Sequence, residues 1–456
     1  MSTPHTEPAN ESGDASGCRP ARSPRPPRSV AEHRDAVRNL LAAGFRERPQ
    51  GTEDTDLISA RGRILAADVA APGSLPPFAN SQMDGYAVHS ADLAAAGNGT
   101  GDSAALVELA VAAPIPAGSE PPALARGTAA PIMTGAMLPP GADAVVPIEQ
   151  AVPDSFPAPE STPPAGAASP PAVRLPSGVP AGQYVRGAGS DIRAGEPALN
   201  GGTVLGPGQL GLLAALGLDR VTVRARPRVL LLTTGDEVVA PGHPLQPGQI
   251  HDANTTLLRS LLEEAGAQVQ LTRVLADSPQ ELRDRLHADL AAGQPDLVIT
   301  SGGISKGAYE VVKQGLEAED VHFLSVAMQP GGPQGIGRVA GIPFLAFPGN
   351  PVSCVVSFEM FLRPALSSVT GLPRPRLQLS AVLREDSRSP AGKHQVRRGR
   401  YLPPAVPGGT GEVELVGGPS SHLVHALAAS NALVHLPAGR ESFPAGTEVT
   451  VWLLDR

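Results

Sequence analysis

The sequence predicts a multidomain protein in which a central parallel α/β domain is combined with smaller β-rich domains. Three observations favour this fold class: a length of 456 residues, alternating strand and helix patterns between residues 227 and 372, and short apolar runs on both sides of that segment. A chain of this length exceeds what one hydrophobic core usually organises, so about three domains are expected. The 51 glycines and 50 prolines also indicate many turns and loops.

The composition argues against several classes of function. A formal charge of −8 and an aromatic content of 3% disfavour a general nucleic-acid binder, which needs basic surfaces and stacking platforms. The basic cluster Arg397-Arg398-Gly399-Arg400 is interpreted as a solvated surface turn. Cys18 and Cys354 are the only cysteines, so neither a disulfide framework nor a cysteine zinc site is expected. No apolar run of about 18 residues occurs, so we expect a cytoplasmic protein without a membrane span or signal peptide.

The N-terminal part is expected to begin as a disordered tail and continue as a helix. Residues 1–28 offer almost nothing to bury, which is typical of disorder. The capping box Ser29-Val-Ala-Glu32 then opens a helix, followed by apolar residues at helical spacing. A second helix-like run extends from Ile58 to Val69.

Short apolar runs between Gly and Pro predict a β-rich domain over residues 75–183. Within it, residues 153–180 are rich in Pro, Ala and Ser and are interpreted as a flexible surface insertion. Residues 207–217 predict a short helix that ends at a glycine.

The segment 227–372 shows the clearest alternation of strands and helices. A continuous apolar run, typical of a strand buried on both faces, occurs at 229–233, and further strands are expected at 267–274, 297–300 and 344–347. Helices are expected between and after them, at 254–264, 278–292, 309–318 and 351–368. Repeated β-α units imply a parallel sheet with right-handed crossovers. After Pro373 short alternating strands predict a C-terminal β domain, 373–456.

Three unusual turns follow the strands of this sheet. In such sheets ligands bind beyond the carboxyl ends of the strands, where glycine N–H groups, hydroxyls and helix dipoles favour an anion such as phosphate. Each sequence alone is more typical of a tight turn than of a phosphate site, but three at one sheet edge predict a binding site. The expected ligand-binding residues are Thr234, Gly235, Asp236, Ser301, Gly302, Gly303, Ser305, Lys306, Pro348, Gly349, Asn350, Pro351 and Ser353.

The same region carries carboxylates, namely Asp236, Glu237, Asp252, Asp277 and Glu310. Carboxylates beside a phosphate site would repel the ligand unless a divalent cation lies between them, so Mg²⁺ is expected. Its expected ligands are Asp236, Glu237 and Asp252. The alternative is that Asp252 and Asp277 cap helices.

Outside this segment, the loop Leu75-Pro-Pro-Phe-Ala-Asn-Ser-Gln-Met-Asp-Gly-Tyr-Ala87 is stiffened by Pro-Pro and Asp-Gly pairs. We expect it to display Asn80, Ser81 and Asp84. The alternative is a plain junction between domains.

This loop, together with further motifs, resembles the MoeA family of molybdopterin molybdenumtransferases, which is related to the E domain of gephyrin. The matching motifs run collinearly from residue 76 onward: Pro76-Pro77-Phe78-Ala79-Asn80-Ser81-Gln82-Met83-Asp84-Gly85-Tyr86, Ile132-Met133-Thr134-Gly135-Ala136, Gly141-Ala142-Asp143-Ala144-Val145-Val146, Arg186-Gly187-Ala188-Gly189-Ser190-Asp191, Thr234-Gly235-Asp236-Glu237, Gly248-Gln249-Ile250-His251-Asp252-Ala253-Asn254, Ser301-Gly302-Gly303-Ile304-Ser305, Pro348-Gly349-Asn350-Pro351-Val352-Ser353, Ser420-Ser421-His422 and Ala429-Ser430-Asn431-Ala432-Leu433.

The resemblance implies an elongated homodimer with four domains per chain, of which residues 29–74 and 184–226 form one discontinuous N-terminal domain. The implied reaction inserts molybdate into adenylylated molybdopterin with release of AMP, and Mg²⁺ is used. The partner subunit would complete the active cleft. Implied partners also include the adenylyltransferase that precedes this step and acceptor molybdoenzymes. The implied functional residues are Asp84, Thr134, Asp191, Glu237, Asp277 and Glu310, the first three coming from the domain opposite the α/β domain.

The sequence departs from the family pattern at several positions. Ala79 and Glu310 stand where Asp is common or usual, and Ser325, Gln329 and Gly332 stand where the family often has lysines. A neutral Gln does not replace a lysine charge, so we hypothesise that Lys306 compensates. Two alternatives therefore stay open: a degenerate paralogue that acts as a pterin-binding or scaffold protein, and the adenylyltransferase, which lacks the Asp84 loop and the flanking β domains.

Overall fold

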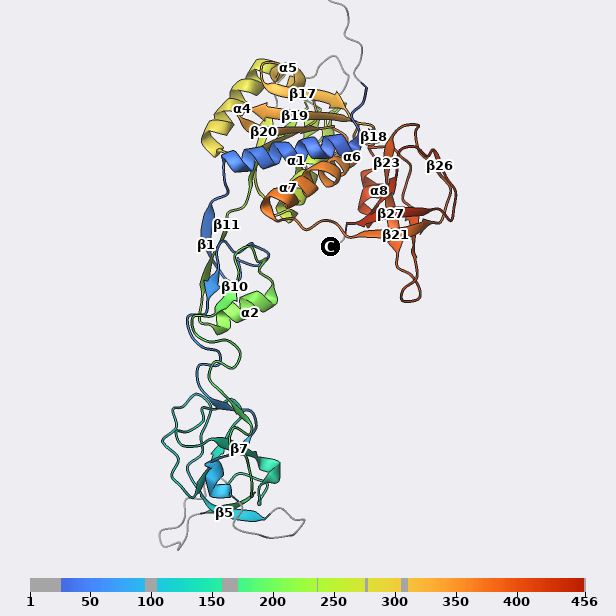
Figure 1. Ribbon diagram of the computed structural model, residues 1–456. Coiled ribbons are helices and arrows are strands. Elements are labelled where there is room, and N and C mark those ends of the chain that lie inside the picture. Colours follow the sequence, from blue (N-terminus) through green and yellow to red (C-terminus); the bar gives the residue numbers. More distant parts are fainter. Residues whose placement is uncertain are drawn as a thin grey trace, which may run out of the picture. The chain divides into compact units, whose positions relative to one another are not determined.

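The computed structural model describes residues 26–94, 105–157, 171–235, 237–274, 278–304 and 311–454. The chain divides into two compact units, which are described separately (Figure 1). The first consists of Met1–Pro49 and Arg226–Arg456, and the second of Gln50–Ala225.

A six-stranded sheet in the order β15-β12-β16-β20-β19-β17 forms the centre of the first unit. Four of its strands are parallel, as the sequence predicted: β12 Arg228–Thr234, β15 Gln268–Val274, β16 Leu297–Ser301 and β20 Ile342–Phe347. The other two, β17 Asp320–Ser325 and β19 Pro333–Val339, are antiparallel, so the expectation of a wholly parallel sheet was wrong at this edge. In β19 a side chain at Gly337 would collide with the backbone of Asp320. Close packing of the strands requires glycine in β19, so this segment lacks the apolar pattern that would have predicted a strand.

Helices cover both faces of this sheet. Alternate residues of β12 enter two different cores: Leu231 packs with Leu258 of α3, and Leu230 packs with Leu286 of α4. This alternation confirms a layered α/β domain. The helices are α3 Ala253–Glu264, α4 Pro279–Gly293, α5 Val311–Gly315, α6 Pro351–Ser357 and α7 Arg363–Thr370. The π-helical segment Phe358–Leu362 joins α6 to α7, and the start of the helix predicted at 309–318 lies outside the described residues.

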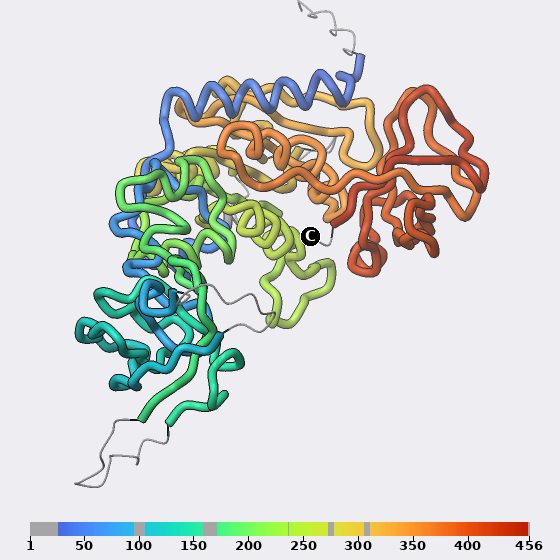
Figure 2. Tube along the Cα trace, turned by 60° about the horizontal axis from the view of Figure 1, so that its bottom comes forward, coloured from blue at the N-terminus to red at the C-terminus, as the bar shows by residue number. Residues whose placement is uncertain are grey.

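The first helix, α1 Val30–Glu47, begins at the predicted capping box. The hydroxyl of Ser29 accepts from the backbone N–H of Glu32 at 3.2 Å, and the N–H of Ser29 donates to the Glu32 carboxylate at 2.8 Å. The apolar face of α1 joins the core around Phe361, and Figure 2 shows α1 running beside the segment of α7. This helix therefore belongs to the first unit, although we expected residues 29–74 to form a domain with residues 184–226.

The C-terminal part of the first unit is a small β-barrel. Its strands pair in a closed ring, β23-β24-β21-β27-β25 and back to β23, which confirms the expected β domain after Pro373. They are β21 Gln378–Leu383, β23 His394–Leu402, β24 Gly411–Leu415, β25 Ala432–Leu436 and β27 Glu448–Leu453. The short strand β18 Met328–Gln329 pairs with β23 and ties the α/β domain to the barrel.

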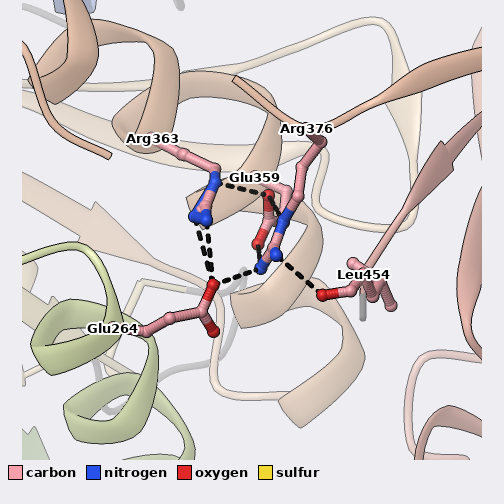
Figure 3. Close-up of polar contacts among 5 residues, drawn as sticks. All are labelled: Glu264, Glu359, Arg363, Arg376 and Leu454. Carbon is pink, nitrogen blue, oxygen red and sulfur yellow. Dashed lines mark hydrogen bonds and ion pairs between the residues drawn. The ribbon is translucent and has the colours of Figure 1, made fainter. Parts of the chain in front are cut away.

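A buried ion network also joins the barrel to the α/β domain (Figure 3). Arg376, in the segment between α7 and β21, lies 2.9 Å from the carboxylate of Glu359 and 3.0 Å from that of Glu264. It also donates to the carbonyl of Leu454 at 2.7 Å, and Arg363 contacts Glu264 at 2.8 Å. Because Glu359 is 1% exposed and lies between two guanidiniums, its charge is neutralised inside the protein.

The second unit contains a five-stranded sheet and a smaller region. The sheet has the order β7-β4-β6-β5-β8 and confirms the predicted β-rich segment. Its strands are β4 Gly85–Val88, β5 Leu106–Val111, β6 Thr128–Ile132, β7 Ala144–Pro147 and β8 Ala172–Pro176. The smaller region pairs β1 Thr52–Asp56 with β11 Arg220–Arg224, pairs β2 Val69–Ala70 with β10 Pro197–Leu199, and contains the predicted short helix α2 Pro207–Ala215.

The helix expected from Ile58 to Val69 was wrong. Residues 57–62 form turns, with Gly62 at a φ of 75°, and Ile64 and Leu65 pair with distant residues as isolated bridges. Ile58 is 84% exposed. The apolar spacing that imitated a helix therefore reflects separate contacts of an irregular segment.

One described helical run, Pro351–Thr370, is long and apolar enough by length and composition to cross a membrane. Within the structure 78% of its most apolar window is buried inside the protein. It is therefore accounted for as a core helix of the α/β domain.

Candidate functional site

The three turns predicted from the sequence meet at one edge of the sheet in the first unit. They enclose an open cavity of ≈ 1010 Å³. A side chain added to Gly302 would lie 3.2 Å from the carbonyl of Thr234, and one added to Gly349 would lie 3.4 Å from the Cα of Gly302. The turns therefore lie close together. Predicted residues that line this cavity are Thr234, Gly235, Glu237, Asp252, Ser301, Gly302, Gly303, Gly349, Asn350 and Pro351.

Two of these turns need glycine for conformational reasons as well. Gly302 and Gly303 have φ values of 94° and 67°, and Gly235 has a φ of 140°. Residues with a Cβ rarely adopt these values. The turns can therefore bring backbone N–H groups close to a ligand, as an anion site requires.

A side chain that the sequence analysis did not select, Asn254, bridges two of the turns. Its amide nitrogen donates to the hydroxyl of Ser301 at 2.9 Å and to the carbonyl of Gly349 at 2.6 Å. The sequence signal was its position in the Gly248–Asn254 motif, two residues after the capping Asp252.

Asp252 is the N-cap of α3, as the alternative interpretation predicted. Its carboxylate accepts from the backbone N–H of Thr255 at 2.9 Å, and the residue is 4% exposed. Glu237 is exposed at the cavity wall. The described part of the chain contains no group of three or more His, Cys, Asp or Glu residues that could hold a metal ion. The residues described therefore do not by themselves fit Mg²⁺, and the expected ligand Asp236 lies outside them.

Further predicted site residues also lie outside the described part of the chain. They are Asp277, Ser305, Lys306 and Glu310. The lining of the larger cavity given above therefore does not include residues 275–277 and 305–310.

A second cavity, of ≈ 380 Å³, shares Gly349, Asn350 and His422 with the first. Its wall combines the turn after β20, the segment around β18 and the barrel loop that carries Ser420 and Ser421. Ser353, predicted to bind the ligand, lines this smaller cavity. Gln329 also lines it and accepts a hydrogen bond from the Gln395 side chain at 2.7 Å. The wall formed by described residues contains no lysine.

Two buried arginines lie behind the barrel loop of the smaller cavity. Arg397 donates to the carbonyl of Gly417 at 2.9 Å, and Arg398 donates to the carbonyl of Ser420 at 3.2 Å and to that of Gly418. They are 8% and 1% exposed, so the interpretation of Arg397-Arg398-Gly399-Arg400 as a solvated turn was wrong. These residues belong to β23, and burial lowers the pKa of Arg398, with the neighbouring charge of Arg397 adding to this effect. Sequence charge alone did not reveal the carbonyl oxygens that accept their hydrogen bonds.

In the second unit, Asp84 and Thr134 are brought together. The Asp84 carboxylate accepts from the backbone N–H of Thr134 at 2.6 Å and from its hydroxyl at 2.7 Å. These bonds hold the pKa of Asp84 below its ordinary value, the backbone bond being the larger cause. Asp191 is exposed on a separate loop.

The expectation that the loop displays Asn80 and Ser81 was wrong, because they are 4% and 0% exposed. Both residues belong to β3 Asn80–Ser81, which pairs with β9 Val185–Arg186. The hydroxyl of Ser81 donates to the carbonyl of Met83, so it stabilises the loop that presents Asp84.

Comparisons with known proteins agree with this architecture. Residues 28–217, 230–368 and 380–454 match the family models described as MoeA N-terminal region (domain I and II), probable molybdopterin binding domain, and MoeA C-terminal region (domain IV).

Curated relatives and solved structures match over nearly the whole chain. Molybdopterin molybdenumtransferase 2 of Mycobacterium tuberculosis is 42% identical over 93% of this chain and 99% of its own length. Molybdopterin molybdenumtransferase of Haemophilus influenzae is 34% identical over 88% of this chain and 94% of its own length. The crystal structure of a molybdopterin biosynthesis MoeA protein from Pyrococcus horikosii has a TM-score of 0.72 and 28% identity, covering 94% of this chain and 99% of its own. With three family models in order and relatives of this identity over almost their full length, the chain belongs to the MoeA family.

Proposed function

We propose that this chain is a cytoplasmic enzyme of molybdenum cofactor biosynthesis that inserts molybdate into adenylylated molybdopterin and releases AMP. The observation that carries the proposal is the cavity of ≈ 1010 Å³ formed where three glycine-containing turns meet at the carboxyl ends of the strands. Such an edge suits the phosphate groups of a nucleotide. Relatives named molybdopterin molybdenumtransferase support the assignment of the reaction.

In this proposal the larger cavity binds the pterin nucleotide and the smaller one takes the molybdate oxyanion. The two cavities adjoin at Gly349, Asn350 and His422, so ligands in them would be neighbours. Arg397 and Arg398 supply positive charge behind the smaller cavity. The family often has this charge as lysines at the positions of Ser325, Gln329 and Gly332. Fixed positive charge and hydrogen-bond donors stabilise the anions that the reaction brings together.

We place Asp84, Thr134 and Asp191 across the larger cavity, contributed by the partner subunit of a homodimer. The hydrogen bonds between Asp84 and Thr134 support a shared role, since they hold the carboxylate ionised and fix its orientation. Mg²⁺ remains an expected cofactor of the reaction, and no step is assigned to it. Its expected ligands are Asp236, Glu237 and Asp252, of which Asp252 also caps α3. The acceptor molybdoenzymes and the preceding adenylyltransferase remain expected partners.

A second candidate function is a protein that binds the pterin nucleotide without turnover, as a scaffold. The observation that favours it is the neutral wall of the smaller cavity, where Gln329 lies. The adenylyltransferase alternative has less support, because the chain also matches the MoeA N-terminal and C-terminal regions.

The test is to incubate the full chain with adenylylated molybdopterin, Mg²⁺ and molybdate, and to follow AMP release. Release that depends on molybdate supports the transferase, and binding without release supports the scaffold. Formation of adenylylated pterin from ATP would indicate the adenylyltransferase. Asp84→Asn should lower the rate, whereas Asp154→Asn, on an exposed loop of the same unit, serves as a matched control.

A further inference from the structure

We propose that Asn254 is a positioning residue, which fixes the spacing of the turns after β16 and β20 and thereby the shape of the larger cavity. The inference rests on the proposed function in one respect, because it takes the bound ligand to be adenylylated molybdopterin. It adds a residue to the site through the turns that this residue holds, not through contact with the reacting atoms.

The first support is the direction of the hydrogen bonds that Asn254 makes. Asn254 is the second residue of α3, and its amide nitrogen reaches both Ser301, at the end of β16, and Gly349, after β20. The carbonyl of Gly349 only accepts hydrogen bonds, so the nitrogen and not the oxygen of the amide must face it. One amide group thus links a helix to the ends of two strands.

The second support is the continuation of this linkage beneath the cavity. The hydroxyl of Ser301 lies 3.2 Å from the sulfur of Cys354, and the thiol of Cys354 donates to the carbonyl of Pro348 at 2.9 Å. Both side chains are buried, and burial raises the pKa of Cys354 to about 12, so the thiol keeps its proton. The hydrogen bonds therefore run in one direction, from Asn254 through Ser301 and Cys354 to Pro348.

The third support is an unsatisfied group. The side-chain oxygen of Asn254 is buried and has no hydrogen-bond partner in the part of the chain that the structure describes. A buried acceptor without a partner is unfavourable for stability, so such groups require an explanation. The explanation that we infer is that the nitrogen of the same amide is needed, because its two hydrogen bonds fix two turns that line the cavity.

The two turns lie close together, since a side chain added to Gly349 would be 3.4 Å from the Cα of Gly302. The Asn254 bonds limit the separation of these turns. Loss of the amide is expected to widen the edge of the cavity.

Two substitutions separate this role from a contribution to folding. Asn254→Asp keeps the size of the side chain and places a carboxylate in the first turn of α3, where the helix dipole favours it. The carboxylate has no N–H to donate and repels the carbonyl of Gly349. Asn254→Ala removes the same bonds without adding a charge. Asn39→Asp, on an exposed face of α1, is the matched control for the change of an amide to a carboxylate.

The first measurement is the Kd for adenylylated molybdopterin, together with the thermal unfolding midpoint of each variant. We expect binding about tenfold weaker for Asn254→Ala and about a hundredfold weaker for Asn254→Asp, with the control unchanged. Asn254→Asp should keep the midpoint of the unaltered chain. Equal affinity of both Asn254 variants and the unaltered chain would overturn the inference.

The second measurement is amide hydrogen exchange of the ligand-free chain, which does not depend on the proposed function. Exchange should become faster at residues 302–304 and 349–352 in both Asn254 variants and stay the same in the middle of α3. Unchanged exchange at these turns would overturn the positioning role. Failure of the unaltered chain to bind adenylylated molybdopterin would instead count against the proposed function, and the exchange result distinguishes the two cases.

Discussion

Two pairs of buried arginines lie in the first unit, and their hydrogen-bonding partners differ in kind. Arg363 and Arg376 contact the carboxylates of Glu264 and Glu359 at distances from 2.8 to 3.6 Å (Figure 3). Arg397 and Arg398 instead donate to backbone carbonyls, and neither forms an ion pair with a carboxylate of the described residues. The first pair joins the barrel to the α/β domain, and the second lies behind the loop of the smaller cavity.

The difference indicates why each pair is buried. Charges that face each other cancel locally, so the network around Arg376 fixes the position of two elements without affecting the site. Carbonyl oxygens accept hydrogen bonds from Arg398 but carry no full charge, so no ion pair cancels its positive charge, and its Nε has no partner among the described residues. A guanidinium stays protonated even when buried, so this charge remains available to an anion in the smaller cavity. Four predictions are given from the largest expected effect to the smallest, and the first and third test this contrast directly.

The largest effect is expected from Arg376→Met. The substitution leaves Glu359 buried with one arginine partner fewer, and breaking a buried pair costs about 3–5 kcal/mol in the free energy of unfolding. Denaturant unfolding of the full chain measures it. Arg38→Met is the matched control, because Arg38 forms an exposed pair with Asp35 and should cost under about 1 kcal/mol. Similar costs for both variants would contradict a structural role for the network.

The second prediction concerns a buried base that, unlike arginine, gives up its proton. Burial, with a smaller contribution from the charge of Arg28, lowers the pKa of His33 to about 4, against 6.5 for the free side chain. The unfolded state therefore binds more protons between these values, and the contribution of His33 to stability is lost as the pH falls from 6.5 to 4. The loss amounts to about 3 kcal/mol, and it should be absent in His33→Phe. Unfolding measured across this range in both proteins tests it, and identical pH profiles would refute it.

The third prediction concerns Arg398, which forms hydrogen bonds with backbone carbonyls and no ion pair with a described carboxylate. Arg398→Met should raise the KM for molybdate about tenfold, because the smaller cavity loses positive charge. Arg398→Lys keeps the charge but makes fewer hydrogen bonds to the loop, so it should lose less. An unchanged KM in a folded Arg398→Met protein would show that the pair only holds the loop.

The smallest effect is expected from Lys306→Ala. Lys306 lies outside the described residues, and our hypothesis that it compensates for the missing lysines rests on its place in a glycine-rich turn. One lysine would replace only part of the charge of the missing lysines, so we expect molybdate affinity to fall by about threefold. Unaltered affinity would remove the hypothesis.

The sequence predicted the elements whose patterns are local. The parallel strands, the capping box at Ser29 and the three glycine-rich turns were found because apolar runs, caps and turn residues act over a few positions. The meeting of the turns was also predicted, since carboxyl ends of parallel strands share one edge. β19 was missed because tight packing against β17 requires Gly337.

The parts that could not be predicted depend on contacts between distant residues. Arg397 and Arg398 have the composition of a surface turn, and their burial depends on carbonyls of residues 417, 418 and 420. The same holds for Asn254, whose partners lie 47 and 95 residues away in the chain. No local sequence pattern predicts hydrogen bonds between residues so far apart in the chain, so the structure was needed to identify them.

The most direct test of the central claim is AMP release by the unaltered chain from adenylylated molybdopterin, with and without molybdate. The proposed function predicts release that requires molybdate and that falls in Asp84→Asn but not in Asp154→Asn. Tight binding of adenylylated molybdopterin with no molybdate-dependent release of AMP would contradict it.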